Sequence, residues 1–254
     1  MKKVSTILST AALTLTLLSS VSIANEAKTS HWGYTGHNTP ETWGQLSEKY
    51  HSCSDGLNQS PINITHSITD PKHAPLNISY SDKGSKEVIN NGHTIQVNME
   101  EGDTFVVDGI TFELKQFHFH SPSENHIEGK EFALEAHFVH LDKDGNIAVL
   151  AVMFEEGKEN KDLAKVWAKM PKEEGGKSAL KVKDIAASIL PKEKHYYRFN
   201  GSLTTPPCTE GVRWFVLETP MTVSKEQIDQ FQHTMHHANN RPIQKTNARI
   251  IIEE

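Results

Sequence analysis

The chain has 254 residues, of which 36% are hydrophobic and 23% charged, and its formal net charge at pH 7 is −6. This acidic balance, with no cluster of basic residues to offset it, argues against nucleic acid and anionic membrane surfaces as partners. No repeat, linker or abrupt change of composition divides the chain, so we expect one large domain.

The first 24 residues have the layout of a secretory signal peptide. Lys2 and Lys3 give a positive start, the apolar stretch AALTLTLLSSVSIA follows, and Ser22 and Ala24 are the small residues expected before a cleavage site. The apolar stretch is too short for a membrane span, and no later run is longer. We therefore favour cleavage after Ala24 over a buried N-terminal helix. The exported mature chain, periplasmic or secreted, would be residues 25–254.

Cys53 and Cys208 are the only cysteines. An even count in an exported protein indicates a disulfide, with two free buried thiols as the alternative. Neither residue has a cysteine neighbour at the spacing of zinc ligands.

The remaining patterns predict strands more often than helices. Asn90-Asn91-Gly92 is a turn signal. Apolar or alternating runs with short polar connections predict mostly antiparallel strands at 94–99, 104–107, 110–120, 132–141, 147–154 and 212–217. Asn160 is placed to cap a helix over 160–170, before Pro171, and Ser224 and Gln227 have capping-box spacing for a helix over 224–237.

The segment QFHFHSPSENHIEGKEFALEAHFVH, residues 116–140, concentrates histidines in two of these strands. Side chains alternate along a strand, so Gln116, His118 and His120 share one face while the phenylalanines between them share the other. Two residues along a strand span about 6.6 Å, which lets two imidazoles converge on one metal ion. Alone, such a pair is more often an exposed polar face.

The second run, LEAHFVH, places Glu135 and His137 on one face of its strand. If the two strands pair in antiparallel fashion, His137 stands beside the first two histidines. Gln116 and Glu135 are then placed to accept N–H hydrogen bonds from the imidazoles, as partners of metal-bound histidines do. Three histidine nitrogens without a fourth protein ligand leave an open coordination position, which is typical of catalytic zinc.

With these two histidine segments, the chain closely resembles the α-class carbonic anhydrases, and specifically their exported bacterial branch. The resemblance covers essentially the whole mature chain and rests on these segments: HWGY at 31–34, QSPINI at 59–64, INNGH at 89–93, QFHFH at 116–120, SENHIEGKEFALEAHFV at 123–139, AVLAVMF at 148–154, SLTTPPCTEGVRW at 202–214 and NNRPIQ at 239–244.

The resemblance implies that His118, His120 and His137 are zinc ligands, with Gln116 and Glu135 as their hydrogen-bond partners. It implies reversible hydration of CO₂ to bicarbonate and a proton. Zinc would lower the pKa of bound water to near neutrality, a property established for carbonic anhydrases, and the resulting hydroxide would attack CO₂.

Three further positions match catalytic residues of the family. Thr204 matches the threonine that accepts a hydrogen bond from the hydroxide, and Glu124 matches the acidic residue to which that threonine donates. His93 matches the proton-shuttle histidine, a residue type whose ordinary pKa of about 6.5 suits transfer to buffer.

The resemblance also assigns a substrate pocket, a disulfide and a fold. Thr205 and the apolar residues Val139, Val149, Leu203, Val212 and Trp214 match the CO₂ pocket, although without the resemblance the apolar ones would be ordinary core residues. Cys53 and Cys208 match the disulfide pair of the bacterial branch. The implied fold is mainly β (α+β): a single domain with a central twisted, mostly antiparallel sheet of about ten strands, short peripheral helices and zinc at the base of a conical cleft. Bacterial relatives suggest a homodimer.

Two other functions compete with a lyase. A non-catalytic binding module would have lost ligands, yet the three histidines, Thr204 and Glu124 are present. A metal-buffering protein is suggested by the 15 histidines and would hold several ions. We expect no second metal site, because His126 and His140 fall off the ligand-bearing faces and His233, His236 and His237 resemble a solvated helix end.

Overall fold

The computed structural model of the chain describes residues 31–70, 75–80 and 83–254. The predicted signal peptide lies outside the described residues. The strands are β1 (Asn63–Ile64), β2 (Ile68–Thr69), β3 (Asn77–Ser79), β4 (Ser85–Asn90), β5 (Ile95–Met99), β6 (Thr104–Val107), β7 (Ile110–His120), β8 (His126–Ile127), β9 (Leu134–Leu141), β10 (Ile147–Glu156), β11 (Lys177–Ala179), β12 (Tyr196–Ser202), β13 (Glu210–Leu217), β14 (Met221–Val223) and β15 (Ile252–Glu253). The helices are α1 (Trp43–Leu46), α2 (Ser52–Asp55), α3 (Lys161–Trp167), α4 (Ile185–Ser188) and α5 (Lys225–Met235), with a 3₁₀ turn at Glu48–Tyr50.

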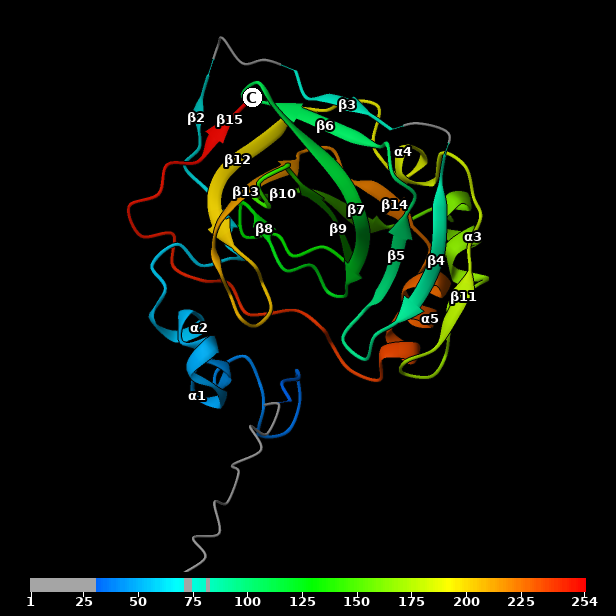
Figure 1. The fold of residues 1–254 in the computed structure, drawn as a ribbon, viewed down its shortest axis with the longest axis horizontal. Helices are drawn as coiled ribbons and strands as arrows, with labels where there is room; N and C mark the ends of the chain where they lie inside the picture. The colour runs from blue at the N-terminus through cyan, green and yellow to red at the C-terminus, as the bar shows by residue number, and fades with distance from the viewer. Residues whose placement is uncertain (1–30, 71–74, 81–82) are drawn as a thin grey trace, which may run out of the picture.

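One large sheet organises the described residues (Figure 1). Its main path runs β11-β4-β5-β7-β9-β10-β13-β12-β15-β2, and β14, β3 and β6 join from the side, which makes 13 strands. Most pairs are antiparallel, as predicted, while β10–β13, β10–β14 and β15–β2 are parallel. The sheet has more strands than the ten or so expected, because several short segments of only two or three residues add to the count.

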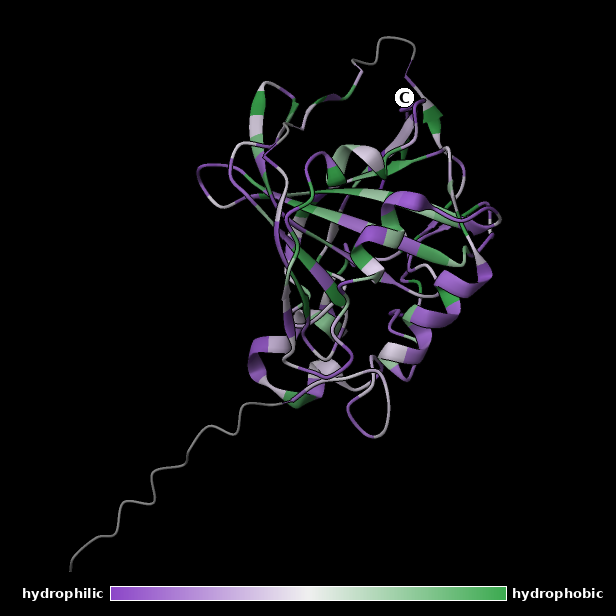
Figure 2. Cartoon of the chain, turned by 90° about the vertical axis from the view of Figure 1, so that its right-hand side faces the viewer, coloured by the Kyte–Doolittle hydropathy of each residue, from purple (hydrophilic) through white to green (hydrophobic). Residues whose placement is uncertain are grey.

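The two faces of the sheet have different surroundings. On one face the phenylalanines of β7 and β9 enter the larger core, where Phe119 meets Trp167 of α3 edge-on with ring centroids 4.9 Å apart. Truncating such a buried aromatic to alanine typically costs about 3–5 kcal/mol. In Figure 2 the peripheral helices carry many hydrophilic residues, and hydrophobic residues band the strands behind them. His118 and His120 of β7 and His137 of β9 therefore face the other way.

Both predicted long helices are confirmed, with their caps. The Asn160 side chain accepts hydrogen bonds from the first turn of α3, and Ser224 and Gln227 form a capping box at α5. The α3 helix ends at Trp167, before Pro171 is reached. None of the helices in the described ranges has the length and apolar character needed to cross a bilayer.

Candidate metal centre and its cavity

The pairing of β7 with β9 brings the histidines together. The strands are antiparallel with His118 opposite His137 and His120 opposite Glu135, after a bulge between Leu114 and Gln116. The predicted arrangement of the two histidine strands is therefore confirmed.

The three imidazoles converge on one point. Each offers one nitrogen, and these nitrogens lie within 4.8 Å of one another. The ring centroids are 5.1 Å apart for His118 and His120, 5.3 Å for His118 and His137, and 4.6 Å for His120 and His137. Burial lowers the pKa of all three rings, so they are neutral at pH 7 and their lone pairs are available to a metal.

The other nitrogen of each ring has a partner that orients it. His118 Nδ1 donates to Gln116 Oε1 at 2.8 Å, and His120 Nδ1 donates to the Asn239 carbonyl at 2.7 Å. His137 Nε2 lies 2.9 Å from Glu135 Oε1. These partners leave His118 Nε2, His120 Nε2 and His137 Nδ1 facing the centre. His120 Nε2 is buried without a hydrogen-bond partner among the described residues, which fits a metal ligand.

Asn239 also supports the candidate metal centre, and the sequence did not predict this role. Its carbonyl orients His120, its side-chain oxygen accepts from the Ser121 N–H at 2.8 Å, and its amide donates to the carbonyls of His93 and Phe119. The NNRPIQ segment was quoted only as part of the resemblance. A buried asparagine after a helix has no sequence pattern that distinguishes it from a surface one.

Two buried glutamates form the wall behind the histidines. Glu135 accepts from the backbone N–H groups of Glu124 and Asn125 at 2.6 and 2.8 Å and from the Asn125 amide at 2.8 Å. Glu124 accepts from the Arg241 N–H at 2.8 Å, and its Oε2 is 3.5 Å from His120 Nε2. Burial raises the pKa of Glu124, while a hydrogen bond from the Thr204 side chain acts in the opposite direction. The predicted pair of Thr204 and Glu124 is thus brought together.

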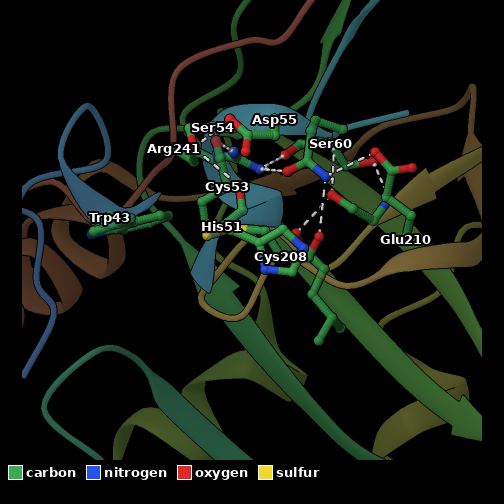
Figure 3. The surroundings of a disulfide bond; sticks show 12 residues. Trp43, His51, Cys53, Ser54, Asp55, Ser60, Cys208, Glu210 and Arg241 are labelled. Atoms are coloured by element: carbon green, nitrogen blue, oxygen red, sulfur yellow. Dashed lines mark hydrogen bonds between the residues drawn. A yellow bond between two sulfur atoms is a disulfide. The ribbon is translucent and has the colours of Figure 1, made fainter. Parts of the chain in front are cut away.

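The Thr204 loop is tied to a disulfide. Cys53 and Cys208 are bonded, as predicted, and the Cys208 N–H donates to the Thr205 carbonyl at 2.8 Å. Figure 3 shows Arg241, Ser60 and Glu210 gathered around this bond. Gln59 donates to both the Cys208 carbonyl and Glu210, each at 3.0 Å. The turn that carries the two threonines is therefore held from several sides.

The predicted pocket residues gather on the histidine side of the sheet. Val149, Val212 and Trp214 are buried in a second apolar cluster, against which Val139 and Leu203 pack while partly exposed. Trp214 meets His137 edge-on with ring centroids 4.9 Å apart. These contacts give the metal centre an apolar wall.

A cavity of about 160 Å³ lies over the centre. Its lining comprises Trp32, Tyr34, Asn91, His93, Thr94, Gln96, Gln116, His118, His120 and Thr205. The His93 imidazole stacks on the Trp32 indole with centroids 3.7 Å apart. Burial lowers the pKa of His93, His31 and His237 act in the same direction, and Glu174 opposes them.

The histidines that the sequence places away from the ligand-bearing faces lie outside the candidate metal centre, which comprises His118, His120 and His137 among the described residues. His140 is buried on the opposite face of β9, and His126 Nε2 is 3.5 Å from Glu131 Oε1. His233 and His236 are exposed at the end of α5. His237 differs from the solvated helix end that the sequence predicts, because its ring lies 5.8 Å from that of Tyr34.

Fold and site together define a class of protein: a twisted, mostly antiparallel sheet with a cluster of three histidines, able to hold a metal ion, beneath a cavity. The family model for eukaryotic-type carbonic anhydrase matches residues 38–254. The chain is 49% identical to the carbonic anhydrase of Pectobacterium carotovorum over 241 residues, or 94% of this chain and 98% of that one. It is also 49% identical to that of Neisseria gonorrhoeae over 243 residues, or 95% of each. The α-carbonic anhydrase of Thermovibrio ammonificans, solved with sulfanilamide, superposes with a TM-score of 0.85 at 50% identity, over 88% of this chain and 99% of that one.

The chain belongs to the α-class carbonic anhydrase family, and its family and fold support the hydration of carbon dioxide. The enzyme class expected from the sequence is confirmed.

Proposed function

We propose that the chain is an exported zinc enzyme that hydrates CO₂ reversibly to bicarbonate and a proton. The observation that carries the proposal is the convergence of three neutral imidazole nitrogens beside the buried pair of Thr204 and Glu124. When bound, zinc would supply hydroxide near neutral pH by lowering the pKa of a coordinated water, the property for which carbonic anhydrases are the standard example.

The partners of the three histidines hold the ligand nitrogens in place. Gln116 Oε1 and the Asn239 carbonyl each accept the N–H of one ring, and Glu135 Oε1 lies 2.9 Å from His137 Nε2. Each of these contacts favours the tautomer that points the lone pair of the ring inward. The negative charge of Glu135 also makes His137 a stronger electron donor to a metal.

Thr204 orients the nucleophile. A threonine hydroxyl has one hydrogen, and Thr204 commits it to Glu124, so only its lone pairs face the cavity. It therefore accepts a hydrogen bond from a nucleophile that carries a proton. That bond turns the nucleophile's own lone pair toward CO₂.

The apolar wall binds the substrate. CO₂ has no net dipole, so an apolar pocket can hold it without hydrogen bonds. The residues of this pocket are Val139, Val149, Leu203, Val212 and Trp214. Thr205 lines the cavity next to this wall.

His93 removes the proton that each turnover releases. It lies in the same cavity as His118 and His120, on the outer side where Trp32 supports its ring. Accepting a proton on one ring nitrogen and losing it to buffer returns the neutral imidazole for the next cycle.

Export is proposed for two reasons. The leader pattern of residues 1–24 predicts a mature chain that begins at Asn25, and the Cys53–Cys208 bond requires an oxidising compartment such as the periplasm. N-terminal sequencing of the protein recovered from the periplasm of an expressing bacterium tests this directly, since a chain that still begins at Met1 would contradict it.

Stopped-flow CO₂ hydration tests the activity. We expect the mature chain to be active, to lose activity on chelation and to regain it with one equivalent of zinc. His137→Ala is expected to abolish both activity and zinc binding, whereas His126→Ala, outside the centre, is expected to retain them. One tightly bound zinc ion without hydration would instead indicate a binding module, and several ions per chain would indicate a metal buffer.

A further inference from the structure

The end of β7 that carries two of the three histidines is paired along one side only. Its register with β9 continues to its last residue, His120. Its register with β5 stops earlier, where Gln96 lies opposite His118, because the chain turns just before β5 begins. Phe119, between the two histidines, therefore lies beyond the last residue that pairs with β5. It is fully buried, and a buried backbone group without a hydrogen-bond partner is unfavourable.

The side chain of Thr94 supplies the hydrogen bonds that a strand would otherwise make. Thr94 Oγ1 accepts from the Phe119 N–H at 3.2 Å and donates to the Phe119 carbonyl at 2.6 Å. The Ile95 carbonyl lies farther from the same hydroxyl, at 3.3 Å. Thr94 is only 6% exposed, so solvent competes little for these bonds. One hydroxyl thus satisfies both backbone groups of the residue between His118 and His120.

The side chain of Asn239 binds the same stretch of backbone from the segment after α5. Its amide donates to the Phe119 carbonyl at 2.9 Å, and its Oδ1 accepts from the Ser121 N–H at 2.8 Å. Asn239 is fully buried. Thr94 and Asn239 therefore share one acceptor, the Phe119 carbonyl, and together they hold the backbone on both sides of His120.

We propose that the side chains of Thr94 and Asn239 are positioning groups for the metal centre. Their bonds to the Phe119 backbone fix the spacing and direction of His118 and His120 before a metal binds. Displacing the Phe119 peptide would displace the Cα atoms on either side of it, and with them two of the three imidazoles. Zinc bonds to nitrogen are about 2.0–2.1 Å long, and a site loosened by more than about 0.5 Å loses its geometry. The inference deepens the proposed function and rests on the three histidines as zinc ligands.

The Phe119 ring restrains the same residue from the opposite face of the sheet. It packs edge-on against Trp167 of α3 in the larger core. Phe119 is therefore anchored by its ring on the core side and by its backbone on the side of Thr94, which lines the cavity. Loss of the backbone bonds would leave the ring in place and free only the peptide. This predicts weaker metal binding in a protein that still folds.

The test compares Thr94→Val, which removes the hydroxyl at nearly constant volume, with Thr94→Ser, which keeps it. Ser85→Ala is the matched control, because Ser85 is also buried and makes the same pair of bonds at a site outside the cavity. Its Oγ accepts from the Val182 N–H at 3.3 Å and donates to the Leu180 carbonyl at 2.6 Å.

Zinc affinity, measured by competition with a chromophoric chelator, is the first readout. We expect Thr94→Val to bind zinc about 10-fold more weakly than the wild type, the lower end of the effect of losing a group that supports a metal ligand. Thr94→Ser and Ser85→Ala should bind zinc as the wild type does. The urea midpoints of the metal-free Thr94→Val and Ser85→Ala variants should fall alike, which separates positioning from stability. Co²⁺ bound in place of zinc reports ligand geometry through its visible spectrum, which should change in Thr94→Val and not in the control.

Asn239→Ala provides a second, independent variant for the shared acceptor. In either single variant the Phe119 carbonyl keeps one donor, whereas the double variant with Thr94→Val leaves it none. We therefore expect the double variant to lose more zinc affinity than the product of the two single losses. Losses that simply multiply would contradict the shared role of that carbonyl.

The outcomes separate this inference from the proposed function. Wild-type zinc affinity and cobalt spectrum in Thr94→Val, alongside a His137→Ala variant that no longer binds zinc, would overturn the positioning role and leave the metal centre intact. Equal weakening of zinc binding in Thr94→Val and Ser85→Ala would assign the effect to stability and overturn it as well. A wild-type chain that binds no zinc would overturn the proposed function itself.

Discussion

The backbone N–H of Arg241 donates to Glu124 Oε1 at 2.8 Å, and the buried guanidinium of the same residue binds the disulfide region. It donates to the carbonyls of Cys53 and Ser60 and to Gln59 Oε1, all within 2.9 Å. One residue thus joins the segment that carries Cys53 to the glutamate behind the metal centre.

Arg241→Lys should destabilise the protein strongly. An ammonium group cannot reach three acceptors in a planar arrangement, and each buried acceptor left without a partner costs about 1–3 kcal/mol. We expect the free energy of unfolding in urea to fall by about 2–4 kcal/mol. Arg249→Lys is the control, because Arg249 also donates to three carbonyls but is only partly buried. Equal losses in the two variants would contradict the role given to burial.

Thr204→Val keeps the volume of the side chain and removes the hydroxyl. Because we propose that the hydroxyl orients the nucleophile, we expect kcat/KM for CO₂ hydration to fall by about 10²-fold, the usual effect of losing one oriented hydrogen bond in an active site. Thr204→Ser, which keeps the hydroxyl, should retain most of the activity. Zinc content should be unchanged in both variants. A valine variant as active as the serine variant would show that the hydroxyl is not needed.

Gln116→Ala should weaken metal binding without removing a ligand. His118 Nδ1 loses its acceptor, so the ring is free to turn and to change tautomer. The loss of such a partner typically reduces zinc affinity by about 10–100-fold. Competition with a chromophoric chelator measures the dissociation constant. Gln96→Ala is the control, since Gln96 also lines the cavity but donates to Asn98. The prediction is wrong if both variants bind zinc as the wild type does.

Much of the candidate metal centre could be predicted from the sequence, because the alternation of side chains along a strand determines which histidines share a face. The alternation of histidine and phenylalanine in β7 placed His118 and His120 on one face, and the pattern of β9 placed His137 opposite them. Asn239 and Arg241 lay beyond that reasoning. Their contacts join segments more than 100 residues apart, and no local pattern encodes such pairing.

The sequence did not predict some of the strands, for a different reason. The β12 segment, Tyr196–Ser202, mixes arginine, asparagine and glycine with its aromatic residues, and it is a strand because β13 pairs with it. Tertiary pairing decides such a segment more than its own propensity does.

Reducing the disulfide should affect both stability and catalysis. The bond joins residues 155 apart, and closing so long a loop contributes about 5 kcal/mol in the chain-entropy model. Since Cys208 closes the turn that begins at Thr205, we also expect kcat/KM to fall. Thermal melting and CO₂ hydration of the oxidised and reduced protein measure the two effects. The Cys53→Ala and Cys208→Ala double variant, treated with the same reductant, separates loss of the bond from other effects of the reagent.

Buried His140 should make stability depend on pH. Its Nδ1 donates to the Ala148 carbonyl at 3.3 Å, so Nε2 is the acceptor for the Tyr80 hydroxyl at 2.8 Å. Burial lowers the pKa of His140 to about 4, against about 6.5 in the unfolded chain. Between these values the unfolded chain binds more protons, so the stability contributed by His140 is complete above pH 6.5 and is lost as the pH falls toward 4. The loss amounts to about 3 kcal/mol.

Urea unfolding of metal-free protein at pH 4.5, 5.5 and 7 measures this dependence. His140→Gln removes the titrating ring while keeping a donor and an acceptor, so its stability should be lower at pH 7 but fall less steeply on acidification. Carboxylates and the metal-binding histidines titrate in both proteins, and the difference between the two curves therefore isolates His140. Parallel curves would show that His140 binds its proton equally well in the folded and unfolded chains.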